Sequence, residues 1–72
     1  MNDTIANRLK SLRVEHEISQ RKLAEELGIS NSTVARAESG GSIPGTYVVM
    51  KYAEHFCVST DWILFGGEAD DQ

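Results

Sequence analysis

The chain has 72 residues, of which 40% are hydrophobic and 25% charged, with one proline, six glycines and a net charge of −4. This ordinary globular composition excludes a collagen-like or fully disordered chain, and the length suits one compact domain rather than two. We expect the domain over residues 1–67 and an acidic, frayed tail at 68–72.

The charges are divided unevenly between the two halves of the chain. Residues 1–36 carry six Lys or Arg and five Asp or Glu, a net charge of +1, whereas residues 37–72 carry one lysine and six acids, a net charge of −5. Phosphate affinity comes mainly from Lys and Arg. Only the first half is therefore expected to face an anion, and the acidic second half is a candidate surface for a protein partner.

Few side chains are available for metal, cofactor or nucleophilic chemistry. Cys57 is the single cysteine, which excludes an internal disulfide, and the two histidines are 39 positions apart. His55 and Cys57 are close in sequence, but one histidine beside one cysteine does not indicate a catalytic site. A redox sensor at Cys57 is a remote alternative. We expect no metal, no cofactor and no enzyme activity. The apolar stretches are too short for a membrane span or a signal peptide, so we expect a cytoplasmic protein.

Apolar spacing and capping residues predict three helices in the first half of the chain. The first follows the N-cap Asp3 and runs to about Glu15. Ser19 caps a second helix, which ends at Gly28, because glycine enters the left-handed conformation without steric cost. Ser30 caps a third helix over residues 31–39. The inward positions of these helices are Ile5, Leu9, Leu12, Leu23, Ala24, Leu27 and Val34.

Two more helices are predicted after a loop at 40–44. One covers about 45–56, with its apolar residues at i, i+4 and i+7, and a short one follows the cap Ser59 and ends at Gly66-Gly67. No period-2 alternation or internal repeat is present. The predicted fold class is all-α.

The second and third helices, joined by residues 28–30, form the supersecondary unit that places a helix in the DNA major groove. Counting Gln20 as the first position, Ala24 is fifth, Gly28 ninth and Val34 fifteenth. Ala24 lets the two helices cross closely, Gly28 makes the turn, and Val34 packs the second helix onto the first. The spacing therefore predicts a helix-turn-helix over about residues 20–38.

At this point the chain strongly resembles the Xre/Cro-type helix-turn-helix family of phage repressors and bacterial regulators. The resemblance covers roughly residues 4–66 and rests on the segments RLKSLR (8–13), ISQ (18–20), LAEELGIS (23–30) and STVAR (32–36). Downstream, the matching residues are Glu38, Gly40, Pro44, Lys51, Ala53, Val58, Ser59, Asp61 and Trp62. The resemblance implies the compact five-helix, lambda-repressor-like DNA-binding domain.

The resemblance also implies which side chains contact DNA bases. Asn31, Ser32 and Arg36 stand where the family's base-contacting side chains lie. Arginine can fork onto guanine, asparagine can pair with adenine, and serine can donate or accept. The alternatives are that Arg36 is a solvated surface residue and that Asn31 and Ser32 merely favour a helix start.

A second group of residues is implied to hold the DNA backbone. Gln20 matches a family position that contacts a phosphate and braces the recognition helix, and Ser30 caps that helix. Thr33 is a candidate for a backbone or thymine-methyl contact. Arg21, with Lys22, belongs either to a solvated face or to non-specific phosphate binding.

Three further expectations concern the assembly of the domain. Arg13 and Glu38 match a family ion pair that ties the first helix to the end of the recognition helix. Trp62 and Phe65 are candidates for a dimer seam, with core filling as the alternative. The loop 40–46 has no Lys or Arg, although DNA binders of this family often have basic residues there, so tight binding is expected to need a dimer or a partner.

The sequence is therefore interpreted as a sequence-specific double-stranded DNA-binding transcriptional regulator of bacterial or phage origin. It is expected to be repressor-like and to bind a palindromic operator as a homodimer. The alternative is a protein-interaction module of antitoxin or anti-repressor type, which would keep the fold and bind a protein through its acidic half.

Overall fold

The computed structural model describes residues 4–66 and contains five α-helices in that range. They are α1 (Ile5–Glu15), α2 (Gln20–Leu27), α3 (Asn31–Ser39), α4 (Thr46–Phe56) and α5 (Thr60–Phe65). The described range contains no strand, so the all-α prediction is confirmed. The predicted tail at 68–72 and the domain limit at Gly67 lie outside the described residues.

Hydroxyl side chains begin four of the five helices. Each accepts the backbone N–H three residues further on, which satisfies one of the donors that a helix start leaves open. The four pairs are Thr4 with Asn7, Ser19 with Lys22, Ser30 with Thr33, and Ser59 with Trp62. The prediction of Asp3 as the first cap is wrong. Helix α1 begins at Ile5, which puts Thr4 at the capping position, and Asp3 itself lies outside the described residues.

Three of the five described helices, α2, α3 and α4, end at a residue with left-handed backbone. Gly28 (φ 74°) and Gly40 (φ 84°) end α2 and α3 as predicted. Cys57 takes the same conformation (φ 58°) after α4, and Glu17 (φ 59°) does so between α1 and α2. A side chain with a Cβ is disfavoured there by roughly 1–2 kcal/mol, so these two residues carry local strain.

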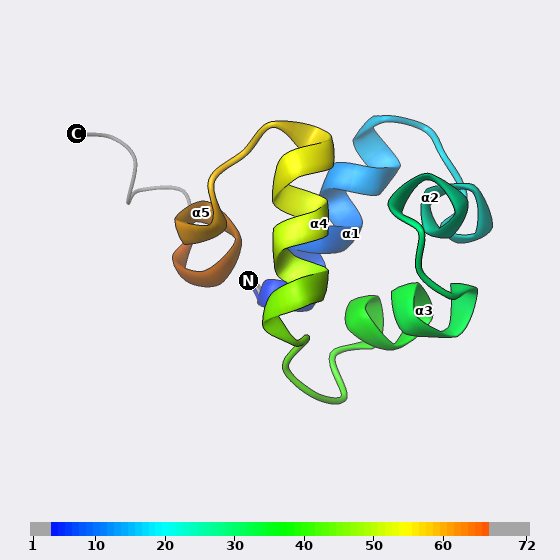
Figure 1. Ribbon diagram of the computed structural model, residues 1–72. Coiled ribbons are helices and arrows are strands. Elements are labelled where there is room, and N and C mark those ends of the chain that lie inside the picture. The colour runs from blue at the N-terminus through cyan, green and yellow to red at the C-terminus, as the bar shows by residue number, and fades with distance from the viewer. Residues whose placement is uncertain (1–3, 67–72) are drawn as a thin grey trace.

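The helices pack around a single apolar core. Helix α3 packs against α1 and α2, α5 packs against α1 and α4, and α2 also contacts α4. In Figure 1, α2 and α3 lie on one side of α4 and α5 lies on the other. The core residues are Leu9, Leu12, Leu23, Ala24, Leu27, Val34, Ala37, Val49, Tyr52, Ala53 and Ile63. No helix within residues 4–66 is long and apolar enough to span a membrane.

Candidate nucleic-acid interface

The turn between α2 and α3 holds the two helices at a fixed angle. The Gly28 N–H donates to the Ala24 carbonyl at 2.9 Å, and the Ile29 N–H donates to the same carbonyl at 3.1 Å. These bonds close the end of α2, and the Ser30 hydroxyl then starts α3 by accepting from the Thr33 N–H at 3.0 Å. The chain therefore passes from α2 to α3 within three residues.

Helix α3 has one buried face and one exposed face. Val34, Ala37 and Glu38 are buried, whereas the three predicted base-contacting side chains are exposed. Of these, Ser32 and Arg36 are four positions apart and so share one side of the helix, and Asn31 adjoins them at its start. The structure thus leaves Asn31, Ser32 and Arg36 facing outward together.

The predicted backbone-contacting residues differ in how free their side chains are. Arg21 is exposed on α2, and Thr33 is half-buried. The Ser30 and Thr33 hydroxyls lie 2.7 Å apart and share one hydrogen, whichever of them donates it. Because each hydroxyl has a single hydrogen, the pair can offer only one to an outside acceptor.

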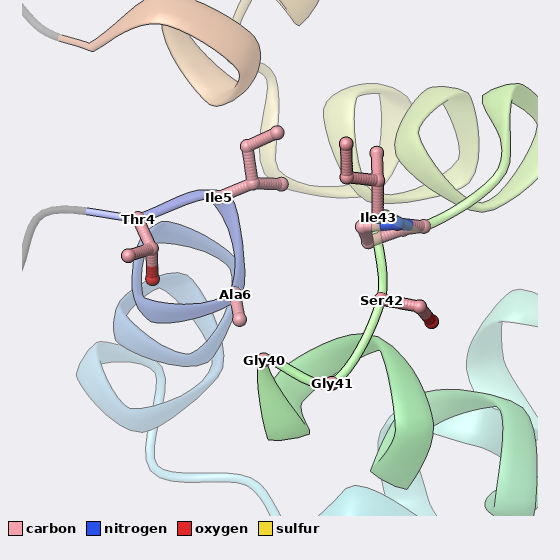
Figure 2. Close-up of a pocket in the computed structure, with 8 residues that line it drawn as sticks. Thr4, Ile5, Ala6, Gly40, Gly41, Ser42 and Ile43 are labelled. Carbon is pink, nitrogen blue, oxygen red and sulfur yellow. The ribbon is translucent and has the colours of Figure 1, made fainter.

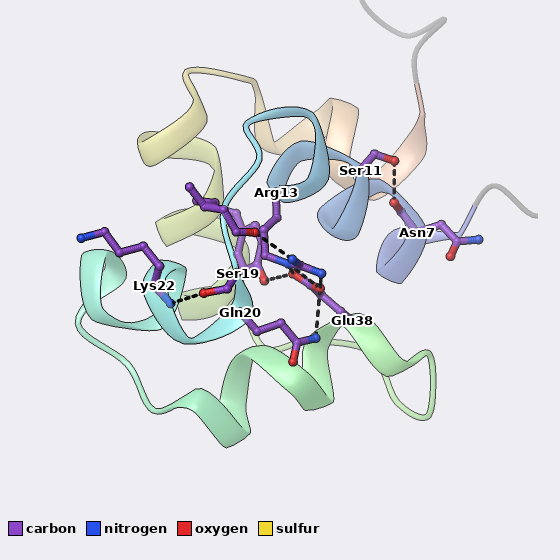
Figure 3. Close-up of polar contacts among 9 residues, drawn as sticks. Asn7, Ser11, Arg13, Ser19, Gln20, Lys22 and Glu38 are labelled. Carbon is purple, nitrogen blue, oxygen red and sulfur yellow. Dashed lines mark hydrogen bonds and ion pairs between the residues drawn. The ribbon is translucent and has the colours of Figure 1, made fainter.

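Arg13 and Glu38 lie together between α1 and α3, as Figure 3 shows. The Arg13 Nη2 atom is 2.9 Å from Glu38 Oε1, and Arg13 Nε donates to both carboxylate oxygens at 3.0 and 3.1 Å. The Glu38 side chain is 1% exposed and that of Arg13 is 12% exposed. Arg13 also donates from Nη1 to the Ile18 carbonyl at 2.9 Å, so one guanidinium ties α1 both to α3 and to the turn before α2.

Two further donors reach the Glu38 carboxylate. Gln20 donates from Nε2 to Oε1 at 3.3 Å, and Tyr52 donates from its hydroxyl to Oε2 at 2.8 Å. The pKa of Tyr52 is raised far above its ordinary value, first because burial removes water from the phenolate and then because Glu38 is adjacent. The hydroxyl therefore stays protonated and remains a donor. Residues from α1, α2 and α4 thus converge on one carboxylate of α3.

Sequence reasoning missed two of the buried polar side chains. Tyr52 is completely buried, and Arg8 is 7% exposed. Arg8 donates from Nε to the Ile63 carbonyl at 2.7 Å and from Nη2 to the Leu64 carbonyl at 3.1 Å, so α1 holds the end of α5. Helical spacing was the signal that could have found them, because Arg8 lies three positions after Ile5 and four before Leu12, and Tyr52 lies three positions after Val49 and four before Phe56.

His55 and Cys57 do not form a site. His55 Nε2 lies 2.8 Å from Glu26 Oε1 on α2, and Cys57 is exposed. The His55 ring meets the Phe56 ring edge-on, and His16 packs against the same ring with a centroid separation of 4.7 Å. Within residues 4–66, no group of three or more His, Cys, Asp or Glu side chains is placed to hold a metal ion.

The two candidates for a dimer seam have different surroundings. Trp62 is half-buried and packs against the core, whereas Phe65 is 75% exposed. Other large apolar side chains are also exposed: Val14, Ile43, Tyr47 and Met50. Phe65 is therefore the freer of the two candidates, and Trp62 contributes to the core.

A hollow of about 400 Å³ lies between the start of α1 and the loop after α3 (Figure 2). It is lined by Thr4, Ile5, Ala6, Gly40, Gly41, Ser42, Ile43 and Pro44. None of these residues has an ionisable side chain, so this hollow offers no acid and base pair for catalysis.

Comparison with known proteins gives a consistent set of relatives. Residues 9–63 match a family model described as helix-turn-helix. The uncharacterized HTH-type transcriptional regulator YgzD of Bacillus subtilis is 33% identical over 59 residues, covering 82% of this chain and 89% of that protein. The uncharacterized HTH-type transcriptional regulator MJ0272 of Methanocaldococcus jannaschii is 34% identical over 58 residues, covering 81% and 88%.

One solved structure is similar along most of the chain. A crystal structure of the P22 c2 repressor protein in complex with a synthetic operator matches with a TM-score of 0.82 at 21% identity, over 92% of this chain and 100% of that chain. At this identity, the likeness shows that the two proteins share a fold.

Proposed function

This chain belongs to the helix-turn-helix family, and from that membership we propose that it is a transcriptional regulator that binds double-stranded DNA sequence-specifically. Helix α3 enters the major groove, and α2 crosses the DNA backbone. The observation that carries the proposal is that α3 has one buried face and one exposed face. Its inner face is fixed in the core, while its outer face presents three polar side chains of the types that read bases.

The proposed base contacts follow from the chemistry of that outer face. Arg36 forks onto the O6 and N7 atoms of a guanine, and Asn31 pairs with an adenine through its amide. Ser32 donates to or accepts from a neighbouring base edge. All three are exposed in the free protein, so DNA binding does not require them to leave a buried position.

The proposed backbone contacts come from Gln20, Arg21 and the start of α3. Arg21 supplies an exposed positive charge, and Gln20, the first residue of α2, supplies a side-chain amide N–H. Ser30 and Thr33 together supply one hydroxyl hydrogen, because the other is shared between them. These contacts set the register of the helix on the DNA but do not read its sequence.

We propose that two copies bind a palindromic operator. One chain has a single recognition helix and seven Lys or Arg, with none in the loop 40–46. Two copies on half-sites about 34 Å apart double the number of contacts. The exposed Phe65 supports a dimer interface at α5, which would also include the exposed part of the half-buried Trp62. Repression is the favoured outcome, since the structural neighbour bound to an operator is a repressor.

Binding of a labelled mixed-sequence duplex, followed by fluorescence anisotropy at low and high salt, tests this proposal. We expect binding at low salt that weakens as the salt concentration rises. A plot of the logarithm of the association constant against the logarithm of the salt concentration should have a slope of about −0.9 for each phosphate neutralised. Arg36→Ala weakens it, whereas Lys10→Ala, which removes an equal charge from α1, changes it less. The absence of any binding at low salt would contradict the proposal and would favour a protein-interaction module that uses the acidic half of the chain.

A further inference from the structure

We propose that Tyr52, which is buried and distant in sequence from the helix-turn-helix, is a positioning residue for the DNA-backbone contact of Gln20, acting through the Glu38 carboxylate. This inference rests on the proposed function, because it assigns a role within the DNA-binding surface. Tyr52 itself is completely buried and does not reach a bound duplex. Any effect of its hydroxyl on DNA binding is therefore transmitted through other side chains.

The two oxygens of Glu38 have different partners. Oε2 accepts from the Tyr52 hydroxyl at 2.8 Å, and Oε1 accepts from Gln20 Nε2 at 3.3 Å. Arg13 reaches both oxygens from Nε, at 3.0 and 3.1 Å, and reaches Oε1 a second time from Nη2 at 2.9 Å, so Oε2 has the weaker hold from Arg13 and depends more on the Tyr52 hydroxyl. The Tyr52 hydroxyl, which approaches from α4, fixes Oε2 in the interior and thereby leaves Oε1 directed at the amide of Gln20.

The bond to Glu38 determines which hydrogens Gln20 can offer to DNA. An amide nitrogen has two hydrogens, and Glu38 occupies one of them, so the second remains available to a phosphate oxygen. Gln20 is half-buried at the first position of α2. Holding its side chain in one rotamer before DNA arrives removes an ordering cost from binding. Without the Tyr52 hydroxyl, Oε2 keeps only its 3.1 Å bond from Arg13, so the carboxylate is held less firmly and the Gln20 amide loses part of this fixed orientation.

The free protein offers a direct test. The chain has two glutamines, Gln20 and Gln72, so the side-chain amide signal of Gln20 is identified in an ¹H–¹⁵N spectrum by its loss in Gln20→Ala. We expect Tyr52→Phe to shift this signal and to reduce the difference between the chemical shifts of the two amide hydrogens. Tyr47→Phe is the matched control, because it removes the same oxygen from an exposed position on the same helix. An unmoved Gln20 signal in Tyr52→Phe would overturn the inference.

DNA binding supplies the second test, through a double-mutant cycle on a duplex selected from a random pool. Tyr52→Phe and Gln20→Ala should each weaken binding by roughly twofold to tenfold. Adding Tyr52→Phe to Gln20→Ala should weaken it no further, because the residue through which Tyr52 acts is already absent. Effects that multiply would show that Tyr52 only supports the fold, and would overturn the inference.

A different substitution covers the case in which Tyr52→Phe does not fold. In the Tyr47→Phe chain Tyr52 is the sole tyrosine, so growth on 3-fluorotyrosine makes its hydroxyl a stronger donor while the ring stays in place. The Gln20 signal should then move, and an unmoved signal overturns the inference. Failure of every form to bind any duplex would overturn the proposed function and this inference with it, whereas binding without coupling would overturn the inference alone.

Discussion

The substitution Glu38→Ala removes the acceptor shared by the buried Tyr52 hydroxyl, the partly buried Arg13 guanidinium and the Gln20 amide. The Tyr52 hydroxyl loses a 2.8 Å hydrogen bond, and the Arg13 guanidinium, on a side chain 12% exposed, loses its carboxylate. Breaking a buried ion pair from one side costs about 3–5 kcal/mol. A single-core domain of this size has roughly 3–5 kcal/mol of stability in total. We therefore expect the variant to be largely unfolded at 25 °C.

Urea unfolding, followed by far-ultraviolet circular dichroism and by the fluorescence of the single tryptophan, Trp62, measures this loss. The control is Glu26→Ala, which removes a carboxylate that also pairs at 2.8 Å, with His55, but has 31% of its side chain exposed. An exposed pair of this kind contributes about 0–1 kcal/mol. If Glu38→Ala cost no more than Glu26→Ala, the argument that burial makes this carboxylate indispensable would be wrong.

Three further substitutions test separate parts of the fold by the same unfolding measurement. Arg8→Met keeps the aliphatic stem but loses the hydrogen bonds to the α5 carbonyls, and should lower the free energy of unfolding by about 1.5–3 kcal/mol. The control Lys10→Met, at an exposed position on the same helix, should change it little, and equal losses would refute the role of Arg8. Cys57→Gly removes about 1–2 kcal/mol of left-handed strain but adds about 0.5–1 kcal/mol of chain entropy in the unfolded state, so it should gain about 0.5–1 kcal/mol, and a loss would refute the strain. The raised pKa of Tyr52 means that the folded state holds this proton more tightly than the unfolded chain does. The contribution of this proton to the free energy of unfolding is complete below about pH 10 and falls by about 1.4 kcal/mol for each pH unit above it. Tyr52→Phe should remove this dependence on pH, and Tyr47→Phe should retain it.

Much of the fold could be predicted from local sequence signals. Ser19, Ser30 and Ser59 are followed by helical apolar spacing, and glycine stands at three of the helix ends, so local capping chemistry specified these boundaries without reference to any tertiary contact. The same applies to the outer face of α3, because the inward position of Val34 determines which neighbours face out. The first cap was misassigned by one position because Asp3 and Thr4 are adjacent and both prefer that role.

The polar interior could not be predicted, because it depends on residues far apart in the chain. Arg8 and Ile63 are 55 positions apart, and Tyr52 and Glu38 are 14 positions apart, so neither pair leaves a periodic signal. Arginine is usually exposed, and an apolar stripe gives no reason to bury it. Likewise, sequence alone did not distinguish Trp62 from Phe65, since the difference in their exposure comes from how the short α5 lies against α1 and α4.

Selection of bound sequences from a random duplex pool, performed with the natural chain and with Arg36→Ala, tests the central claim most directly. The natural chain should enrich a two-fold symmetric motif with half-sites about one helical turn apart. Arg36→Ala, which should fold as stably because Arg36 is exposed, should lose preference mainly at one base pair in each half-site and about 1–3 kcal/mol of affinity. No enriched motif, or the same motif uniformly weakened in the variant, would contradict base reading by α3.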